Sequence, residues 1–198
     1  MTALVHDEDL DPAGDLVLIV GELNSQTRIR VSSKVMALAS PVLAAMLGPN
    51  YREGQALSEQ GLLELELPDD DPEAMVCLCK AFHMKLILGP ISILLLEKIA
   101  LLCDKYDEAL ALSSWSDTWL AEFAGSVDGE DSLPKLLWIS YALGNHFHFW
   151  VSSFGMMWNY TEEGLLATEA ELVGTCLPKG ILGKSLRQEH PEDGAHSS

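Results

Sequence analysis

Hydrophobic and polar positions along the chain predict strands first and helices after them. Leu16–Val20 is an unbroken aliphatic run that ends at Gly21, which is typical of a buried strand. Thr27–Val31 alternates polar and apolar residues after a polar turn, so the two runs predict a hairpin of strands. Leu62–Leu67 alternates leucine with glutamate and predicts a third strand that has one face in water.

A proline divides the segment after the second strand into two short helices. Ser32 and Ser33 provide a cap for the first helix. Ser40-Pro41 ends that helix and begins the next, because proline cannot continue the hydrogen-bond ladder but fits a first helical turn. The second helix is expected to run to Leu47, and the polar residues 50–61 after it are expected to form a loop.

Apolar residues at helical spacing dominate the rest of the chain. A helix is predicted after Asp71-Pro72, where an acidic cap precedes a proline at the first helical position. A long amphipathic helix is predicted within 91–112, and a shorter one at 115–123. Glycine and acidic residues at 125–131 indicate a linker, after which helix is predicted to return.

The order of these elements, together with specific residues, resembles the BTB/POZ domain in the shorter form common among fungal proteins. The residues that carry the resemblance are Gly14–Gly21, Ile29–Leu47, Leu65–Asp70 with Pro72–Ala74, and Ile99–Tyr106. The resemblance implies an α/β (α+β) fold, in which a small three-stranded sheet carries a helical hairpin and flanking helices, followed by a C-terminal helical extension. The function it implies is a non-catalytic protein–protein interaction module that recognises partners through the helical hairpin and the following helices.

On this basis we expect four parts in the chain. Residues 1–14 form an acidic tail, 15–124 the BTB/POZ-like domain, 125–182 the helical C-terminal extension and 183–198 a disordered tail. The expected partner is another protein, with self-association as a further expectation.

The resemblance also implies candidate partner-binding residues. In the family, an acidic residue at the first strand and a basic residue at the head of the hairpin form a charged patch, and Asp15 and Lys34 match those positions. Taken alone, the residues equally allow Asp15 to cap a turn and Lys34 to be a solvated helix-start residue, since a surface ion pair contributes little. Val42, Leu43 and Met46 form the apolar side of the second short helix and are expected to pack on the sheet or on a partner.

Two alternative functions stay open. A substrate adaptor of a cullin-type ubiquitin ligase often shows a hydrophobic-x-Glu signature after the third long helix, and residues 83–90, which occupy that place, contain no glutamate. A transcription-associated subunit is the other alternative. It would act through a partner, because the chain has no basic helix and no zinc finger.

The net charge narrows the classes of partner further. The 198 residues contain 30 Asp and Glu against 12 Lys and Arg, which gives a net charge of −18. A surface this acidic repels phosphate backbones and anionic lipids, so we expect no direct binding to nucleic acid or membrane. The four cysteines lack disulfide spacing and no signal peptide opens the sequence, which together favour a cytoplasmic or nuclear location.

No motif predicts a catalytic, metal or cofactor site, so we expect neither enzyme activity nor a cofactor. Cys77 and Cys79 point about 200° apart on a helix, so both thiolates cannot reach one metal, and core positions are expected for them. His146 and His148 have the same spacing and the same limitation.

The segment Trp138–Trp158 contains no Asp, Glu, Lys or Arg and is long enough to cross a bilayer. Its histidines, serines, Asn145 and a central Gly144 favour buried globular helices instead. Some of the aromatic residues in this region are alternatively anchors for a partner, since Trp and Tyr dominate interface hot spots.

Overall fold

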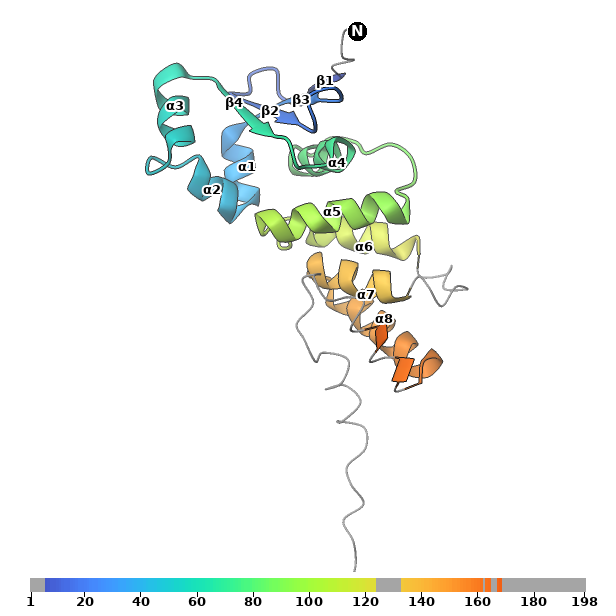
Figure 1. Cartoon of the computed structure of the whole chain (residues 1–198). Helices are drawn as coiled ribbons and strands as arrows, with labels where there is room; N and C mark the ends of the chain where they lie inside the picture. The colour runs from blue at the N-terminus through green and yellow to red at the C-terminus, as the bar shows by residue number, and fades with distance from the viewer. Residues whose placement is uncertain (1–5, 124–132, 162, 165–166, 169–198) are drawn as a thin grey trace, which may run out of the picture.

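A computed structural model of the protein describes residues 6–123, 133–161, 163–164 and 167–168. Within these residues the protein is a mixed α/β structure, in which one four-stranded sheet lies at one end and eight helices extend away from it (Figure 1). The expected linker at 125–131 and the expected tail at 183–198 lie outside the described residues.

Three strands of the sheet are those that the hydrophobic pattern predicts. β2 (Leu16–Val20) and β3 (Thr27–Val31) form the antiparallel hairpin, and β4 (Leu63–Leu67) lies parallel to β2. Alternate residues face the helices and are buried there, namely Leu16, Leu18, Val20, Ile29, Val31, Leu63, Leu65 and Leu67. This apolar face is one wall of the core.

The expected sheet of three strands is wrong, because the predicted acidic tail contributes a fourth. β1 (His6–Asp9) lies parallel to β3 at the edge of the sheet, which has the order β1-β3-β2-β4. Its register places acidic residues opposite Arg28 and Arg30, and Glu8 reaches Lys80 of a helix at 3.4 Å. The Glu8–Lys80 ion pair joins this acidic strand to that helix.

The proline-divided hairpin is present as α1 (Ser33–Ala39) and α2 (Pro41–Met46). Residues 50–61, expected to be a loop, instead contain α3 (Arg52–Gln60), which ends where Gly61 adopts a φ of 72°. The sequence of α3 is polar, but its backbone packs closely: a Cβ at Gly54 would lie 2.0 Å from the carbonyl oxygen of Gly48. Close backbone contact thus holds a helix that has few apolar side chains to bury.

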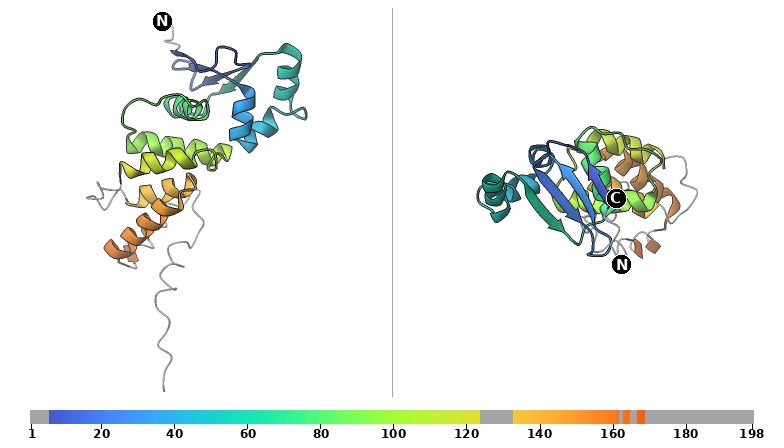
Figure 2. Two further views of the ribbon diagram at one scale, coloured as in Figure 1. Left: turned by 180° about the vertical axis from the view of Figure 1, so that it is seen from behind. Right: turned by 90° about the horizontal axis from the view of Figure 1, so that it is seen from above.

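Two layers of helices lie below the sheet (Figures 1 and 2). α4 (Pro72–Phe82) begins at Asp71, whose carboxylate accepts from the Ala74 N–H at 3.0 Å, as the cap pattern predicts. α5 (Ile93–Tyr106) and α6 (Ser113–Ala121) form the next layer. The predicted helix over 91–112 ends early, because Asp107 turns into the left-handed region with a φ of 54°.

The last layer is α7 (Leu133–Ala142) with α8 (His146–Asn159), at the end of the molecule opposite the sheet (Figure 1). A turn at Gly144, with a φ of 64°, separates the two helices, so Trp138–Trp158 does not form one long helix. No helix among the described residues has both the length and the apolar content to cross a membrane.

Candidate functional site

The corner of the helical hairpin is fixed to the end of α5 by one buried hydroxyl. Ser40 Oγ donates to the carbonyl oxygen of Tyr106 at 2.6 Å and accepts from the Leu43 N–H at 3.0 Å. Both Ser40 and Tyr106 are buried. The N-cap of α2 is therefore also a tertiary contact, and it sets the direction in which α2 leaves the core.

The three apolar candidates on α2 lie in different environments. Leu43 is 1% exposed and belongs to the hydrophobic core, and Met46 is partly buried against that core. Val42 is 38% exposed. Of the three, Val42 is the most exposed, and a partner can contact it without rearrangement of the core.

A more exposed apolar residue of the hairpin, Leu38, is absent from the predicted candidates. It is 88% exposed on α1, whereas Met36, two positions earlier, is fully buried. That spacing places the two side chains on opposite sides of a helix, so the periodicity of α1 could have identified Leu38. We use the name hairpin surface for the exposed apolar residues of α1 and α2, which are Leu38, Pro41, Val42, Ala44 and Ala45.

Asp15 is joined to the head of α1, and the contact is to Ser33. One carboxylate oxygen of Asp15 accepts from the Ser33 N–H and the other from the Ser33 hydroxyl, both at 2.7 Å. Partial burial opposes ionisation of Asp15, but the bonds from Ser33, helped by the nearby charge of Lys34, outweigh it and hold the pKa of Asp15 below its ordinary value. Lys34 is exposed, and the ion pairs within 4.0 Å in the described part of the chain do not include it.

The imidazole of His83 holds the head of α1 from the other side. The Ser32 N–H donates to Nε2 of His83 at 3.1 Å, and Nδ1 of the same ring lies 2.9 Å from the carbonyl oxygen of Cys79. The end of α4 is thereby tied to the start of α1. A histidine that follows a predicted helix carries no sequence signal for this role.

A buried polar group lies beneath the hairpin, where α4 and α5 meet. Asp70 accepts from Lys105 Nζ at 2.6 Å and from the Tyr106 hydroxyl at 2.5 Å. Burial, with the hydrogen bond and charge of Asp70, raises the pKa of Tyr106. Burial, with the charge of Asp70, also raises the pKa of Glu108 to about 8, and Glu108 Oε2 has no hydrogen-bond partner among the described residues. Tyr106 and Glu108 therefore keep their protons at neutral pH. The hydrogen bonds from Lys105 and Tyr106 to Asp70 hold the start of α4 against the end of α5.

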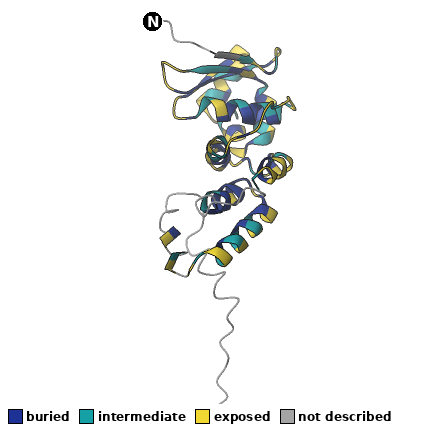
Figure 3. Cartoon of the chain, turned by 90° about the vertical axis from the view of Figure 1, so that its right-hand side faces the viewer, coloured by how far each residue is buried: buried dark blue, intermediate teal, exposed yellow. Residues whose placement is uncertain are grey.

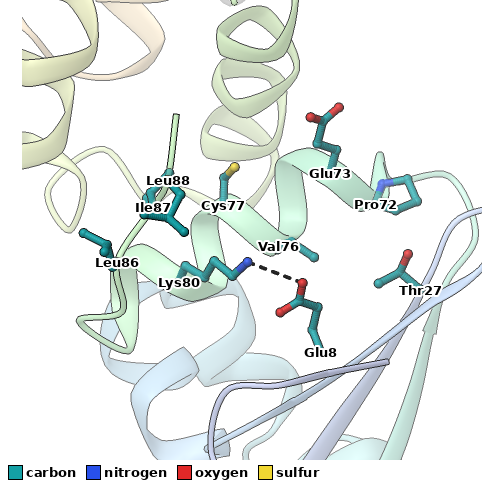
Figure 4. A pocket seen from close by; sticks show the side chains of 10 residues that line it. All are labelled: Glu8, Thr27, Pro72, Glu73, Val76, Cys77, Lys80, Leu86, Ile87 and Leu88. Carbon is teal, nitrogen blue, oxygen red and sulfur yellow. Dashed lines mark hydrogen bonds and ion pairs between the residues drawn. The ribbon is translucent and has the colours of Figure 1, made fainter. Parts of the chain in front are cut away.

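A groove lies between the β1–β3 edge, α4 and the loop after α4 (Figure 4). It encloses about 410 Å³, and the Glu8–Lys80 ion pair crosses it. Leu86 and Leu88, 74% and 84% exposed, lie at one end. Cys77 lines the groove, but burial, with the charge of Glu73, raises the pKa of its thiol, so the protonated form prevails at neutral pH.

The described residues contain no group of three or more His, Cys, Asp or Glu side chains arranged to hold a metal ion. Cys79 is fully buried and Cys77 is 9% exposed, in agreement with the core positions expected for them. Burial raises the pKa of Cys79 as well, which disfavours the thiolate that a metal would require.

No protein-family model matches the chain, and no curated protein matches it. The hairpin surface is exposed and apolar, and the Ser40–Tyr106 hydrogen bond joins it to α5.

Proposed function

We propose that this chain is a non-catalytic protein–protein interaction module of BTB/POZ type, which recognises its partner through the hairpin surface and the helices that follow. The observation that carries the proposal is the exposure of Leu38 and Val42 on a corner that Ser40 fixes to α5. Apolar side chains on a rigid element gain contact area on binding and lose little conformational freedom. The β2–β3 hairpin, the α1–α2 corner and a β4 parallel to β2 support the proposal, because they occur in the order on which the resemblance rests.

The net charge of the chain narrows the kind of contact surface that its partner can have. With a net charge of −18, the protein attracts partners whose contact surface is basic, repels acidic ones and does not oppose the approach of an apolar surface. The hairpin surface itself is apolar, and the exposed Lys34 stands at its head. A partner that inserts apolar side chains between Leu38 and Val42 and keeps basic groups at the rim fits both features.

Affinity purification followed by mass spectrometry tests the proposal on the full-length protein. The bait carrying Leu38→Glu with Val42→Glu is expected to lose the partners that the unmodified bait retains, because two charges then occupy the apolar contact. Leu23→Glu is the matched control: Leu23 is 83% exposed in the turn between β2 and β3, outside the hairpin surface. Partners that bind the hairpin variant and the control equally well contradict the proposal.

A second function, the substrate adaptor of a cullin-type ubiquitin ligase, is favoured by the loop after α4. Met84, Leu86 and Leu88 are 84%, 74% and 84% exposed, so this loop presents apolar contacts although it lacks the glutamate of the family signature. Calorimetry with a purified cullin N-terminal domain tests this function. A complex that Leu86→Asp with Leu88→Asp abolishes supports it, and no heat of binding at micromolar concentration contradicts it.

A further inference from the structure

The helix α8 is amphipathic in the reverse of the usual sense. Its most buried positions are mainly small or polar, namely His148 and Ser152 with the N-cap Asn145, followed by Met156, all at most 8% exposed. The residues that face solvent are large and aromatic, namely Phe147, Trp150, Phe154 and Trp158, exposed by 65%, 62%, 50% and 81%. A surface helix of a monomeric protein ordinarily places such side chains inward.

These four aromatic residues, which we call the aromatic stripe, are aligned along one side of α8. Ring centroids of Trp150 and Phe154 are 5.8 Å apart and those of Phe154 and Trp158 are 6.2 Å apart, with interplanar angles of 21° and 24°. The stripe runs about 16 Å along the helix axis. Figure 3 shows exposed positions along α8, which lies at the end of the molecule away from the sheet and from the hairpin surface.

The area of the aromatic stripe is what a small specific interface requires. Each aromatic side chain can bury about 150–250 Å², so the exposed fractions leave roughly 500 Å² of aromatic surface on each chain. Two such surfaces placed together bury about 1,000 Å², the size at which specific protein interfaces begin. A patch of roughly 500 Å² is comparable to the largest apolar patch that a soluble monomer leaves uncovered, and patches of that size are often functional.

The distribution of charge indicates which molecule covers the aromatic stripe. The chain as a whole carries −18, so two copies repel one another over most of their surfaces. The sequence of α8 contains no Asp, Glu, Lys or Arg. The aromatic stripe is therefore a place where two copies approach without bringing like charges into contact, and it offers no charge by which to select a different partner.

We propose that a second copy of this chain covers the aromatic stripe, so that two α8 helices pack across a twofold axis and form a homodimer. In an antiparallel arrangement the axis passes between Trp150 and Phe154, which places Trp150 of one copy beside Phe154 of the other, and Phe147 beside Trp158. The same patch then serves both subunits, as a twofold interface requires. The proposal goes beyond the proposed function, because the hairpin surface stays free in such a dimer.

Light scattering coupled to size-exclusion chromatography tests the proposal on the full-length chain. A dimer mass is expected at tens of micromolar protein. The fraction of protein in the dimer is expected to increase when NaCl is raised from 0.05 to 0.5 M, because salt screens the repulsion between two acidic subunits. Phe154→Glu and Phe154→Lys are each expected to give monomers. An equimolar mixture of the two variants is expected to restore the dimer mass, since opposite charges then meet near the axis.

Matched controls separate this surface from the others. Leu110→Glu changes a leucine that is 90% exposed outside α8 and is expected to leave the dimer intact, as is Leu38→Glu on the hairpin surface. An unmodified protein that is monomeric at 100 µM overturns the proposal, and this includes the case in which another segment of the same chain covers the stripe. A dimer that survives the Phe154 variants, or that only the Leu38 variant disrupts, overturns it as well.

Discussion

The hydroxyl of Ser40 donates to the carbonyl oxygen of Tyr106, 66 residues further along the chain, at 2.6 Å. The Ser40 hydroxyl oxygen also accepts a hydrogen bond from the Leu43 N–H and so caps α2. Ser40→Ala removes both bonds and leaves a buried carbonyl and a buried N–H without this partner. We expect a loss of about 2–3 kcal/mol in the free energy of unfolding, measured by urea denaturation.

Ser32→Ala is the control for that prediction, because Ser32 is the N-cap of α1 by position but its side chain makes no capping bond. The substitution is expected to change the free energy of unfolding by less than about 0.5 kcal/mol. Equal losses in the two variants would show that the tertiary bond to Tyr106 contributes nothing beyond helix propensity.

Asp15 and Lys34 are expected to differ sharply in their effect on stability. Asp15→Ala leaves the N–H and hydroxyl of Ser33 without their acceptor and is expected to cost about 1–3 kcal/mol at pH 7. Lys34→Ala removes an exposed charge and is expected to cost less than about 0.5 kcal/mol. The pKa of Asp15 is lowered in the folded state, so its contribution is complete above its ordinary pKa and is lost as pH falls through the lowered value. Urea denaturation at pH 7 and pH 3 measures both effects, and a larger cost for Lys34→Ala would favour the charged patch.

Neighbouring positions on α2 should separate core from surface. Leu43→Ala is expected to destabilise the protein by about 2–5 kcal/mol, because it empties a core position that is 1% exposed. Val42→Ala is expected to cost less than about 1 kcal/mol, since the side chain is 38% exposed. Thermal unfolding of both variants in one buffer makes the comparison, and similar shifts in Tm would contradict the burial of Leu43.

Glu108 should give the protein an unusual dependence on pH. Its folded-state pKa is about 8 and its ordinary value is 4.5, so the folded protein holds a proton that the unfolded chain releases between these values. The free energy of unfolding should therefore fall from this group by up to about 1.4 kcal/mol per pH unit as pH rises from about 5 to 8. Asp15 and Asp71, whose pKa values are lowered, add no slope in that range, because they are ionised in both states.

Glu108→Gln replaces the neutral carboxyl by a neutral amide and should remove this slope. The variant is expected to equal the unmodified protein near pH 5 and to exceed it in stability at pH 8, as measured by urea denaturation across that range. Glu59→Gln, on the exposed side of α3, is the matched control and should leave the slope unchanged. A slope that persists in the Glu108 variant would show that the carboxyl is solvated.

Local signals were enough to predict the central elements of the fold. The aliphatic run of β2, the alternation in β4 and the Ser40-Pro41 corner each act within a few residues, and the structure contains all three. β1 and α3 were not predicted, because contacts with other parts of the chain stabilise them. β1 is held by its pairing with β3 and by the ion pair between Glu8 and Lys80 of α4, and α3 packs the backbone of Gly54 against that of Gly48.

The candidate site was predictable to a smaller extent. The apolar side of α2 is visible in the sequence, but only tertiary contacts determine that Leu43 enters the core while Val42 stays outside. For α8 the periodicity of the aromatic residues is equally visible, yet it cannot tell which side of the helix faces inward. The most buried positions of α8 hold mainly small and polar residues, contrary to the usual rule for amphipathic helices.

The bond between Ser40 and Tyr106 also bears on when the hairpin reaches its final structure during synthesis. α2 has six residues, too few to persist as an isolated helix in water. The part of the core that holds it includes the end of α5, so a nascent chain that stops before Tyr106 lacks one of the supports of this corner. We therefore expect Leu38 and Val42 to reach their final arrangement late, after α5 has left the ribosome and most of the domain has folded.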